Sequence, residues 1–505
     1  MKKKSVFIIG ILFLILCLLF FIPKNKIKDL ENYDSFIIGS EKSGAFQIEK
    51  LNNYYGASFY NLSSEDFYDA FDYVSKNHNP KNIILLLDPL SLNNEVAITE
   101  ENPLIPNILT ALKKTATKDY NNYIWDIEPI RRLTEPETPS YSKNRISFEN
   151  IEKIKKTCDK KNINLQVIVP PSYKNQVDIQ DFLDELSEIT PYWDFSGNNS
   201  INSDYRFFYK NYNFKTSVGD MILGKIFNDK NQYCPEDFGF YTANDNKTEQ
   251  KIPHIEKTLP VLLYHNIDTV SENAATISLS LFESHIKALK NEGYTAVTFQ
   301  DIIDFVKKGT PLPEKPIIIT FDDGYTSNLK YAGPIFEKYN MKGAINVIGV
   351  SVGKDTYKET GKPMFPHFSF EEAKPYVEKG IFEIQSHTFD MHNSYGLDVD
   401  FRYGVSEKTG ETDEEYIENF INDFSKSKNQ IETALGTKVT TFCYPFGFEN
   451  QISEIILSQM GVDVTLDGDF GVNTIIKGLP QSLRLLKRFE PSEETSPQEL
   501  LERIK

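Results

Sequence analysis

Two adjacent carboxylates, Asp322 and Asp323, follow a continuous apolar run at 317–321 and precede Gly324. Such a β-branched run is typical of a strand that is buried on both faces of a parallel sheet. At the carboxyl end of that strand both side chains can reach one pocket, and ligands of α/β folds bind at this edge. One acid could then hold a metal ion while the other moves a proton. Alone, Asp-Asp-Gly is more often a solvated turn.

Two histidines supply a second group with metal-binding chemistry. His387 and His392 follow the expected strand 382–385. A spacing of five places two helical residues about 140° apart, so the pair suits a loop better than one face of a helix. Two imidazoles and one carboxylate make a three-ligand site with open positions for water and substrate. A lone surface histidine is the alternative for either residue. Together with Asp322 and Asp323, the pair predicts a metal site.

The composition limits the partners of the chain. A length of 505 residues, of which 40% are hydrophobic and 13% aromatic, predicts two or three packed domains. The net charge of −17 argues against nucleic acid and anionic polymers as partners, and a neutral or cationic polymer fits better. The four cysteines are far apart and have neither metal-binding nor disulfide-framework spacing.

The N-terminal residues predict a membrane anchor over 1–28. Three lysines precede an apolar run from Val6 to Ile22, which is just long enough to cross a bilayer core as a helix. A cleaved signal peptide is the alternative, but no small-x-small site follows the run. We therefore expect a single-pass protein of the cell membrane, with the bulk of the chain outside the cell.

The rest of the chain alternates strand and helix patterns in two stretches. Within 32–230, this alternation predicts an α/β domain with a doubly wound parallel sheet. Residues 231–258 are rich in Asn, Asp, Lys and Pro and are interpreted as a linker. Within 259–505, the longer run of strand–helix units predicts a (β/α) barrel, complete or incomplete. The helices expected there lie at 281–292, 299–308, 328–339, 369–379, 416–435 and 451–460.

The first stretch resembles the SGNH (GDSL-like) hydrolases, especially extracytoplasmic members linked to polysaccharide O-acetylation. The resemblance rests on residues 37–43, 60–63, 86–89, 193–197, 212–214 and 218–220. Where that group has its nucleophilic serine this chain has Glu41, and Asn213 stands in place of the late histidine. Ser40 or Ser43 could act as a shifted nucleophile, but no histidine near the end of the domain could serve either. We therefore expect an inactive domain that is a glycan-binding module, a spacer or simply a scaffold.

The second stretch resembles the polysaccharide deacetylases (carbohydrate esterase family 4, the NodB homology domain) over about 259–505. The motifs that carry the resemblance are 320–324, 386–388 with His392, and 442–447. The resemblance implies that Asp323, His387 and His392 hold a divalent metal, with zinc favoured and cobalt or nickel as alternatives. It also implies that Asp322 is the base and that the backbone N–H of Phe446 helps to hold the oxyanion.

Two departures from the family pattern narrow this expectation. Most of the family spaces its two histidines by four, whereas His387 and His392 are five apart. Most of the family also uses a late histidine as general acid, whereas no histidine follows His392 here. Tyr264-His265 at the end of the first strand is similar to the branch that de-N-acetylates poly-β-1,6-N-acetylglucosamine. His265 is therefore the expected acid, with a structural histidine as the alternative. Asp467 and Arg488 match later family positions loosely, and together with Tyr444 of the motif at 442–447 they are expected to have supporting roles.

The expected reaction is hydrolysis of N-acetyl groups on an extracellular polysaccharide that contains N-acetylglucosamine. Peptidoglycan N-deacetylation would use the same residues, and an O-acetyl esterase would use the same metal centre on an ester. A membrane-tethered glycan-binding protein without activity is the alternative from another class. The sequence indicates no protein partner.

Overall fold

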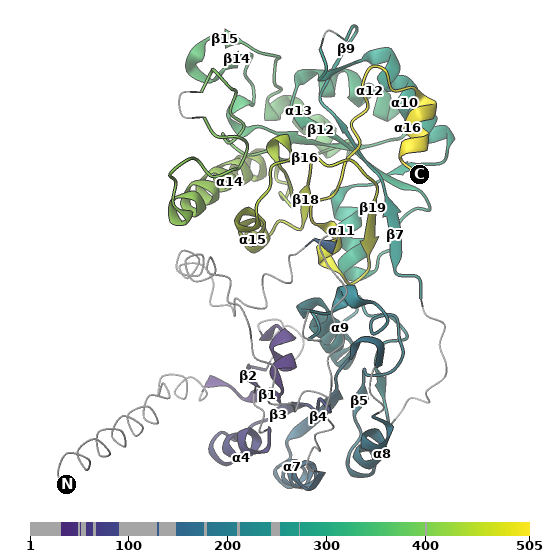
Figure 1. The fold of residues 1–505 in the computed structure, drawn as a ribbon, viewed down its shortest axis with the longest axis vertical. Helices are drawn as coiled ribbons and strands as arrows, with labels where there is room; N and C mark the ends of the chain where they lie inside the picture. The colour runs from purple at the N-terminus through teal and green to yellow at the C-terminus, as the bar shows by residue number, and fades with distance from the viewer. Residues whose placement is uncertain are drawn as a thin grey trace, which may run out of the picture. The chain divides into compact units, whose positions relative to one another are not determined.

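The computed structural model describes residues 32–48, 51, 57–63, 67–89, 129–130, 148–175, 179–209, 213–243, 253–271, 273–398 and 401–505. The expected anchor at 1–28 lies outside these residues, and no helix within them is long and apolar enough to cross a membrane. The chain forms two compact units (Figure 1). Of the described residues, the first unit contains those within 32–89, 148–229 and 235–243, and the second contains those within 129–130, 230–234 and 253–505.

The first unit is built on one six-stranded sheet. Its strands in spatial order are β2 (Phe59–Ser63), β1 (Ser35–Gly39), β3 (Asn82–Leu86), β4 (Asn164–Val169), β5 (Trp193–Asp194) and β6 (Phe240–Tyr241). The first five strands run parallel, in an order typical of doubly wound folds, and β6 is antiparallel to β5. The segment interpreted as a linker therefore contributes a strand to this sheet, because β6 lies within 231–258.

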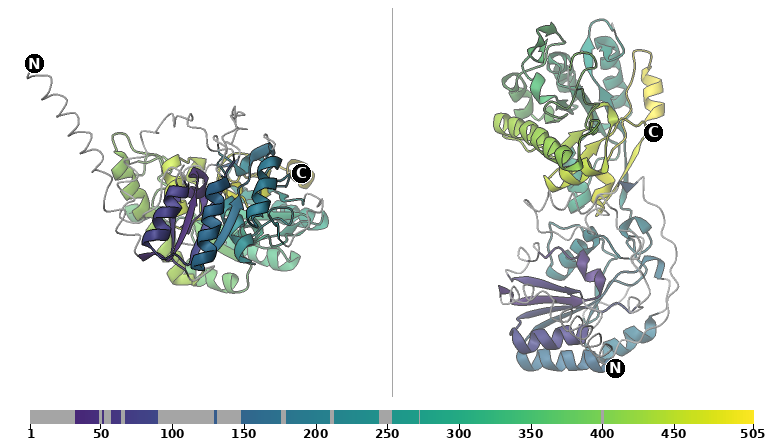
Figure 2. Two further views of the ribbon diagram at one scale, coloured as in Figure 1. Left: turned by 90° about the horizontal axis from the view of Figure 1, so that it is seen from below. Right: turned by 60° about the vertical axis from the view of Figure 1, so that its left-hand side comes forward.

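Helices cover both faces of this sheet. One face carries α4 (Phe67–Asn77), α7 (Phe148–Lys161) and α8 (Gln180–Ile189), and the other carries α9 (Thr216–Phe227) (Figures 1 and 2). The apolar residues of α4, α7 and α8 recur at helical spacing and meet in one core beneath the strands. The predicted α/β fold with a parallel sheet is confirmed for this unit.

The second unit has a seven-stranded parallel sheet. Its strands are β11 (Thr295–Ala296), β12 (Pro316–Asp323), β13 (Gly343–Val347), β16 (Phe382–Ser386), β17 (Thr441–Cys443) and β18 (Val464–Leu466) in spatial order, with β8 (Val261–Tyr264) also paired to β12. The strand β12 is fully buried, as its β-branched run predicts. Its first two residues pair with β11, and residues 318–321 pair with β8.

This sheet curves into a barrel that does not close with regular strand pairing among the described residues. Between β18 and β8 lies the segment 484–489, which we call the seam. It makes one bridge to each neighbour, Leu486 to Leu466 and Phe489 to Leu262. The expectation of a (β/α) barrel is thus met in its incomplete form. Short two-stranded sheets pair β7 (Glu256–Leu259) with β19 (Asn473–Ile476), β9 (Asn266–Asp268) with β10 (Thr276–Ser278), and β14 (Thr356–Tyr357) with β15 (Lys362–Pro363).

The helices of this unit begin and end where local signals dictate. They are α10 (Leu279–Asn291), α11 (Phe299–Lys308), α12 (Gly333–Tyr339), α13 (Phe370–Glu378), α14 (Asp413–Leu435), α15 (Gln451–Gln459) and α16 (Pro497–Arg503). At α11, Thr298 and Asp301 form a capping box, and Gly309 ends the helix with φ +76°. A π-helical turn over Asn328–Ala332 precedes α12, and such turns are frequent at functional sites.

An aromatic core lies under the carboxyl end of β12. Phe321 is fully buried, and its ring contacts those of Tyr264, Phe282, Phe336 and Phe382. Truncation of one such ring to alanine costs about 3–5 kcal/mol of unfolding free energy. Because Phe321 directly precedes the two carboxylates, this packing holds the end of the strand in a fixed position.

Candidate active site

The expected site residues meet at one edge of the second sheet. The strands β12, β13, β16 and β17 are parallel neighbours, so their carboxyl ends lie together. Asp322 and Asp323 end β12, while His387 directly follows β16. The backbone at Asp323 has φ +74°, which interrupts the alternation of a regular strand. Because of this turn both neighbouring carboxylates reach His387, at 4.0 Å and 3.8 Å from its Nε2.

Asp323, His387 and His392 form a compact group whose potential ligand atoms lie within 4.8 Å of one another. The two imidazole Nε2 atoms are 3.8 Å and 3.6 Å from Asp323 Oδ1. Tyr325 donates its hydroxyl to Asp323 Oδ2 at 2.7 Å. In contrast, Asp323 Oδ1 is buried and has no hydrogen-bond partner. Burying an anionic oxygen without a partner costs free energy of folding. A buried oxygen that faces two imidazole nitrogens therefore fits a site for a cation.

The orientation of His387 also suits a ligand. Its Nδ1 lies 2.9 Å from the backbone oxygen of Cys443, so Nδ1–H donates and the lone pair is on Nε2. Burial lowers the pKa of His387 to about 4, against the opposing effect of the Asp322 carboxylate. The imidazole is therefore neutral at neutral pH, as a metal ligand must be.

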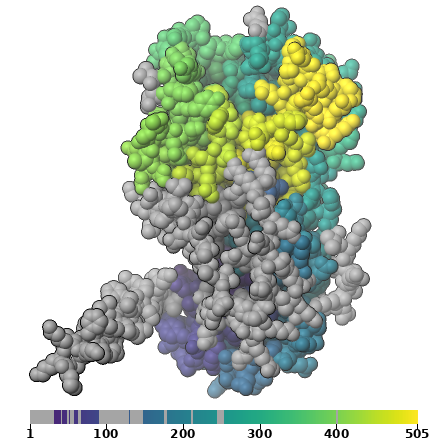
Figure 3. Space-filling model, viewed as in Figure 1, coloured from purple at the N-terminus to yellow at the C-terminus, as the bar shows by residue number. Residues whose placement is uncertain are grey.

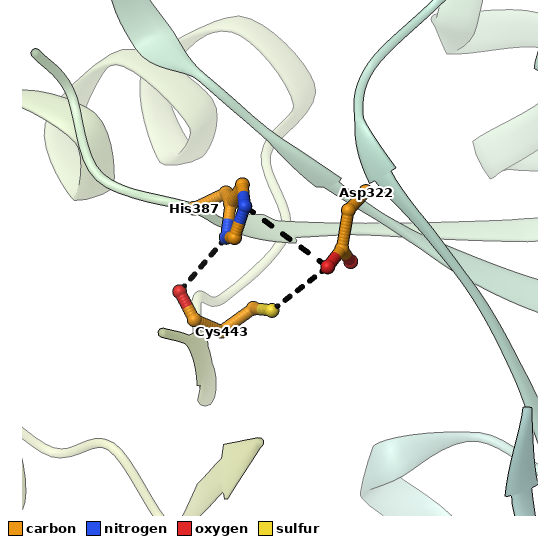
Figure 4. Close-up of side chains that lie close together, drawn as sticks. All are labelled: Asp322, His387 and Cys443. Carbon is orange, nitrogen blue, oxygen red and sulfur yellow. Dashed lines mark hydrogen bonds and ion pairs between the residues drawn. The ribbon is translucent and has the colours of Figure 1, made fainter. Parts of the chain in front are cut away.

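A second group of potential ligands consists of Asp322, Cys443 and His387, and it shares His387 with the first group (Figure 4). Cys443 Sγ donates to Asp322 Oδ2 at 3.3 Å. Burial raises the pKa of this thiol well above its usual value, so the sulfur stays protonated. Arg488 already pairs with Asp322. A protonated thiol and a paired carboxylate make a poor cation site, so the Asp323 group is the better candidate.

Asp322 is an ionised, firmly held carboxylate. Arg488 Nη1 lies 2.9 Å from both of its oxygens, and Asn346 Nδ2 donates to Oδ1 at 2.8 Å. Burial alone would raise the pKa of Asp322, but the Arg488 guanidinium, with His387 and His265, holds it well below its usual value. The Asp322 side chain is thereby held in its charged form next to Asp323, His387 and His392, which we call the metal group.

His265 lies at the end of β8, with its Nδ1 3.0 Å from Glu490 Oε1. This contact is an ion pair and lacks the alignment of a hydrogen bond. Burial lowers the pKa of His265, but Glu490 and the carboxylates Asp323 and Asp322 outweigh it and raise the pKa to about 9. His265 is therefore protonated at neutral pH, and a cation at the neighbouring group would lower this pKa again.

Two neighbours hold this strand end in place. Asn328 in the π-helical turn donates to the backbone oxygen of His265 at 2.7 Å. The Tyr264 hydroxyl lies 3.1 Å from Nδ1 of buried His285, whose Nε2 is 2.7 Å from the backbone oxygen of Thr495. His285 is thus a structural histidine, and it keeps Tyr264 in the core.

The third motif contributes an exposed ring and a strained backbone. Phe446 follows Pro445 with φ +59°, and its ring centroid lies 4.4 Å from that of His392. Asp323, Thr388 and Phe446 all have left-handed backbones at the ends of β12, β16 and β17. Each such residue costs on the order of 1–3 kcal/mol, and this strain is concentrated where the strand ends converge.

The three expected supporting residues differ in their placement. Arg488 contacts Asp322 directly and lies on the seam. The backbone oxygen of Asp467 accepts from Arg488 Nε at 2.9 Å, so Asp467 acts on the site through this arginine. Tyr444 is buried, and its hydroxyl donates to Glu454 Oε1 at 2.8 Å, so it supports the barrel wall.

Sequence reasoning missed Asp423, in the middle of α14. Its two carboxylate oxygens accept from the backbone N–H groups of Phe389 and Asp390 at 2.8–3.3 Å. These groups lie between His387 and His392, so Asp423 fixes the loop that carries both histidines. No local pattern marks Asp423, because it reads as one polar residue of an amphipathic helix.

Asn346, Tyr325 and His367 were also missed. Asn346 could have been found, because it is the penultimate residue of β13, just as Asp322 is the penultimate residue of the neighbouring parallel strand β12. The two residues pair in register. Tyr325 directly follows Gly324. His367 is buried with its ring centroid 4.9 Å from that of Tyr325, and burial lowers its pKa.

Comparisons with known proteins point to the same part of the chain. The family model described as polysaccharide deacetylase matches residues 309–465. The chain is 37% identical to YxkH of Bacillus subtilis (strain 168) over 139 residues, 28% of this chain and 45% of that protein. It is 25% identical over 239 residues to the poly-beta-1,6-N-acetyl-D-glucosamine N-deacetylase of Staphylococcus aureus (strain MRSA252), 44% of this chain and 77% of that protein.

A solved structure of a de-N-acetylase from Aggregatibacter actinomycetemcomitans is 24% identical, with a TM-score of 0.42 over 49% of this chain and 99% of that chain. The chain spans less than half the length of the first curated relatives that it matches.

Proposed function

The chain carries a domain of the polysaccharide deacetylase family, and from this premise we propose that it is a metal-dependent N-deacetylase of an extracellular polysaccharide that contains N-acetylglucosamine. The observation that carries the proposal is the buried Asp323 Oδ1, which has no hydrogen-bond partner and faces the Nε2 atoms of His387 and His392. The substrate would be a neutral acetylated glycan, in keeping with a chain of net charge −17.

We propose that Asp323, His387 and His392 hold a divalent cation. When bound, such a cation supplies Lewis-acid chemistry, since it polarises an acyl oxygen and makes water easier to deprotonate. Two imidazoles and one carboxylate suit zinc, and cobalt or nickel accept the same donors. The supporting observation is the donor set itself, which includes a neutral imidazole with its lone pair on Nε2.

Asp322 is the proposed general base. Its Oδ2 lies 4.0 Å from Nε2 of His387, one of the proposed metal ligands. A water molecule that lies between Asp322 Oδ2 and the proposed cation could therefore lose its proton to this oxygen. Arg488 keeps Asp322 charged across the physiological pH range, and Asn346 prevents its rotation. The ion pair lowers the basicity of the carboxylate in exchange for a fixed position and charge.

His265 is the proposed general acid. Because its Nδ1 faces Glu490, Nε2–H is the proton that it can give to the departing amine nitrogen. The N–H of Phe446 would donate to the oxyanion. In the complete reaction, water adds to the acetamide carbon, the C–N bond breaks, and acetate and a glycan amine leave.

Poly-β-1,6-N-acetylglucosamine is the proposed polymer. His265 at the end of the first barrel strand supports this choice, as does the name of the Staphylococcus aureus relative. The N-terminal run would tether the protein to the membrane with the catalytic unit outside the cell, which is where such a polymer is found. Recovery of an intact N-terminus from the membrane fraction would test the tether.

Acetate release tests the function directly. The full-length protein should release acetate from purified poly-β-1,6-N-acetylglucosamine oligomers, and a chelator should stop this release. Peptidoglycan fragments and an O-acetylated glycan, assayed in parallel, distinguish the peptidoglycan and esterase alternatives. Absence of acetate from all three with metal-loaded protein would leave the glycan-binding alternative.

A further inference from the structure

Five aromatic side chains form a connected strip that begins beside the candidate metal group. We call it the aromatic strip, and it consists of Phe446, Phe448, Tyr403, Phe401 and Tyr395. Phe446 stacks on Tyr403 with 5.0 Å between ring centroids, and Tyr403 lies 4.5 Å from Phe448. The strip continues through Phe401, 6.2 Å from Tyr403, to Tyr395, 5.7 Å farther on. Its inner end touches the site, because Phe446 packs on His392.

The strip is exposed where aromatic side chains are usually buried. Tyr395 is 90% exposed, and Tyr403, Phe446 and Phe448 are 45–47% exposed. Within the described part of the chain, eight large hydrophobic side chains are exposed, and four of them belong to this strip. Figure 3 shows the surface of residues after 400 in green and yellow. Exposed apolar groups that cluster in this way mark an interaction site rather than random surface composition.

The backbone around the strip is firmly held, so the exposure is built into the fold. Arg402 is buried between Phe401 and Tyr403, and it donates to the backbone oxygen of Ser406 and to Glu411. With the arginine turned inward, its neighbour Tyr403 is exposed, while Phe401 is half-buried. At Gly404, a Cβ atom would lie 2.7 Å from the backbone oxygen of Pro445. A glycine there allows the close approach that stacks Tyr403 on Phe446.

We propose that the aromatic strip binds the glycan chain that flanks the sugar undergoing deacetylation. The flat faces of pyranose rings carry C–H groups that stack on aromatic rings, while their hydroxyls point outward to water. An acetylated glycan is neutral, so the charge of −17 cannot attract it, and its affinity must come from uncharged contacts such as these. A row of rings that starts at His392 suits an extended polymer better than a compact protein partner.

The inference rests on the proposed function for the identity of the ligand, and it adds a direction to it. The ring contacts connect His392 through Phe446, Tyr403 and Phe401 to Tyr395, and we infer that this order is the path of the glycan away from the reacting sugar. Sugars on that side of the reacting residue would therefore contribute binding, and affinity should rise with oligomer length until the strip is covered.

Calorimetric titration of the full-length protein tests the strip. The ligands are a dimer and a pentamer of β-1,6-linked N-acetylglucosamine, with chelator present to prevent turnover. Tyr403→Ala should weaken the binding of the pentamer about tenfold and that of the dimer by less than about twofold. Tyr403→Phe keeps the ring and is the matched control, and Tyr73→Ala removes an exposed ring in the first unit. Both controls should bind the pentamer like the unmodified protein.

Glycan binding by the strip is refuted if Tyr403→Ala binds the pentamer normally, or if Tyr403→Phe loses as much affinity as Tyr403→Ala. It is also refuted if the unmodified protein does not bind the pentamer. Acetate release, measured separately on metal-loaded protein, decides the proposed function. Ring-dependent binding without acetate release would support the strip and refute the deacetylase. Acetate release together with pentamer binding that does not depend on the Tyr403 ring would support the deacetylase and refute glycan binding by the strip.

Discussion

The two units present the same kind of sheet edge with opposite polar chemistry. At the edge of the first unit, Lys42 and Asp88 form a buried ion pair at 2.8 Å, directly after β1 and β3. At the edge of the second unit, buried Asp323 Oδ1 has no hydrogen-bond partner. Polar groups that satisfy one another stabilise a fold, whereas an unsatisfied buried carboxylate oxygen costs stability and marks a place for a ligand.

Of the two serines at the first edge, Ser43 follows the same rule, whereas the buried hydroxyl of Ser40 has no hydrogen-bond partner. Ser43 donates its hydroxyl to the backbone oxygen of Ser40, and its Oγ lies 3.0 Å from Asn61 Oδ1. The single histidine between residues 1 and 252 is His78, whose ring packs near Phe36 and Tyr73. It lies just before β3, while the serines follow the other end of the parallel strand β1. Ser–His chemistry therefore has no support at this edge, and an inactive first unit stays a prediction.

The largest effect is expected when a proposed metal ligand at the edge of the second sheet is removed. His392→Ala should lose bound metal and lower acetate release on the order of 10³-fold, because two ligands hold a cation poorly. Metal content by mass spectrometry and acetate release on one preparation check this result. Asp322→Asn is the matched control, and it should keep the metal but lose activity. Full metal occupancy in His392→Ala would mean that the loop histidine is not a ligand.

The next largest effect is expected at His265. His265→Ala should keep its metal and lower kcat on an acetamide about 10²–10⁴-fold, since amine departure needs a proton. An activated aryl acetate, whose leaving group needs no proton, should be affected far less. Equal slowing of both substrates would make His265 a structural residue like His285.

The pKa of His265 adds a pH dependence to this variant. As an acid His265 works in its protonated form, so kcat on the acetamide should fall as pH rises through its pKa, and this fall should vanish in His265→Ala. The folded-state pKa of about 9 exceeds the usual value of 6.5. In chelated protein, the stability that His265 contributes should therefore be fully present below pH 6.5 and lost as pH rises through about 9. Thermal melts of both proteins across this range check the sign.

A smaller loss is expected at Asp423, which touches no ligand directly. Asp423→Asn removes the charge and replaces one acceptor oxygen with a donor, so the N–H groups of Phe389 and Asp390 lose two of their four contacts and share one neutral acceptor. Metal affinity should fall about 10–100-fold while excess metal restores kcat. Ser427→Ala, on the same helix but bonded to Ser386, should change affinity less. A kcat loss that metal does not restore would contradict this positioning role.

No effect on catalysis is expected from the serines of the first unit. The double variant Ser40→Ala, Ser43→Ala should release acetate within about twofold of the unmodified protein, because both serines belong to a different compact unit from Asp323, His387 and His392 and share no hydrogen-bond partner with them. Esterase activity that survives in His392→Ala and disappears when both serines are also replaced would show an active first unit.

The sequence predicted those parts that local signals encode. The helix at 299–308 is correct to the residue, since a capping box at Thr298 and a glycine at 309 define both ends. The grouping of Asp323, His387 and His392 followed from their places at strand ends. Parallel strands bring such ends together whatever the intervening length.

The parts that escaped prediction depend on contacts distant in sequence. Asp423 reaches the histidine loop from a helix more than thirty residues later. Arg488 was expected only to support the site, because it matches a later family position loosely. Its direct contact with Asp322 escaped prediction, since its segment has no strand pattern and reaches Asp322 through the seam. The strand β6 is two residues long within a polar stretch, too short for any periodicity.

The seam also fixes the order in which the second unit becomes competent during synthesis. A ribosome delivers Asp322 and both loop histidines well before residues 484–489. Until that segment docks between β18 and β8, Asp322 lacks the Arg488 guanidinium, and burial then favours its protonated form. A nascent chain thus holds the proposed cation-binding residues before the proposed base is ionised. If the proposed function is correct, catalytic competence is acquired late in biogenesis, after residues 484–489 have been translated and packed.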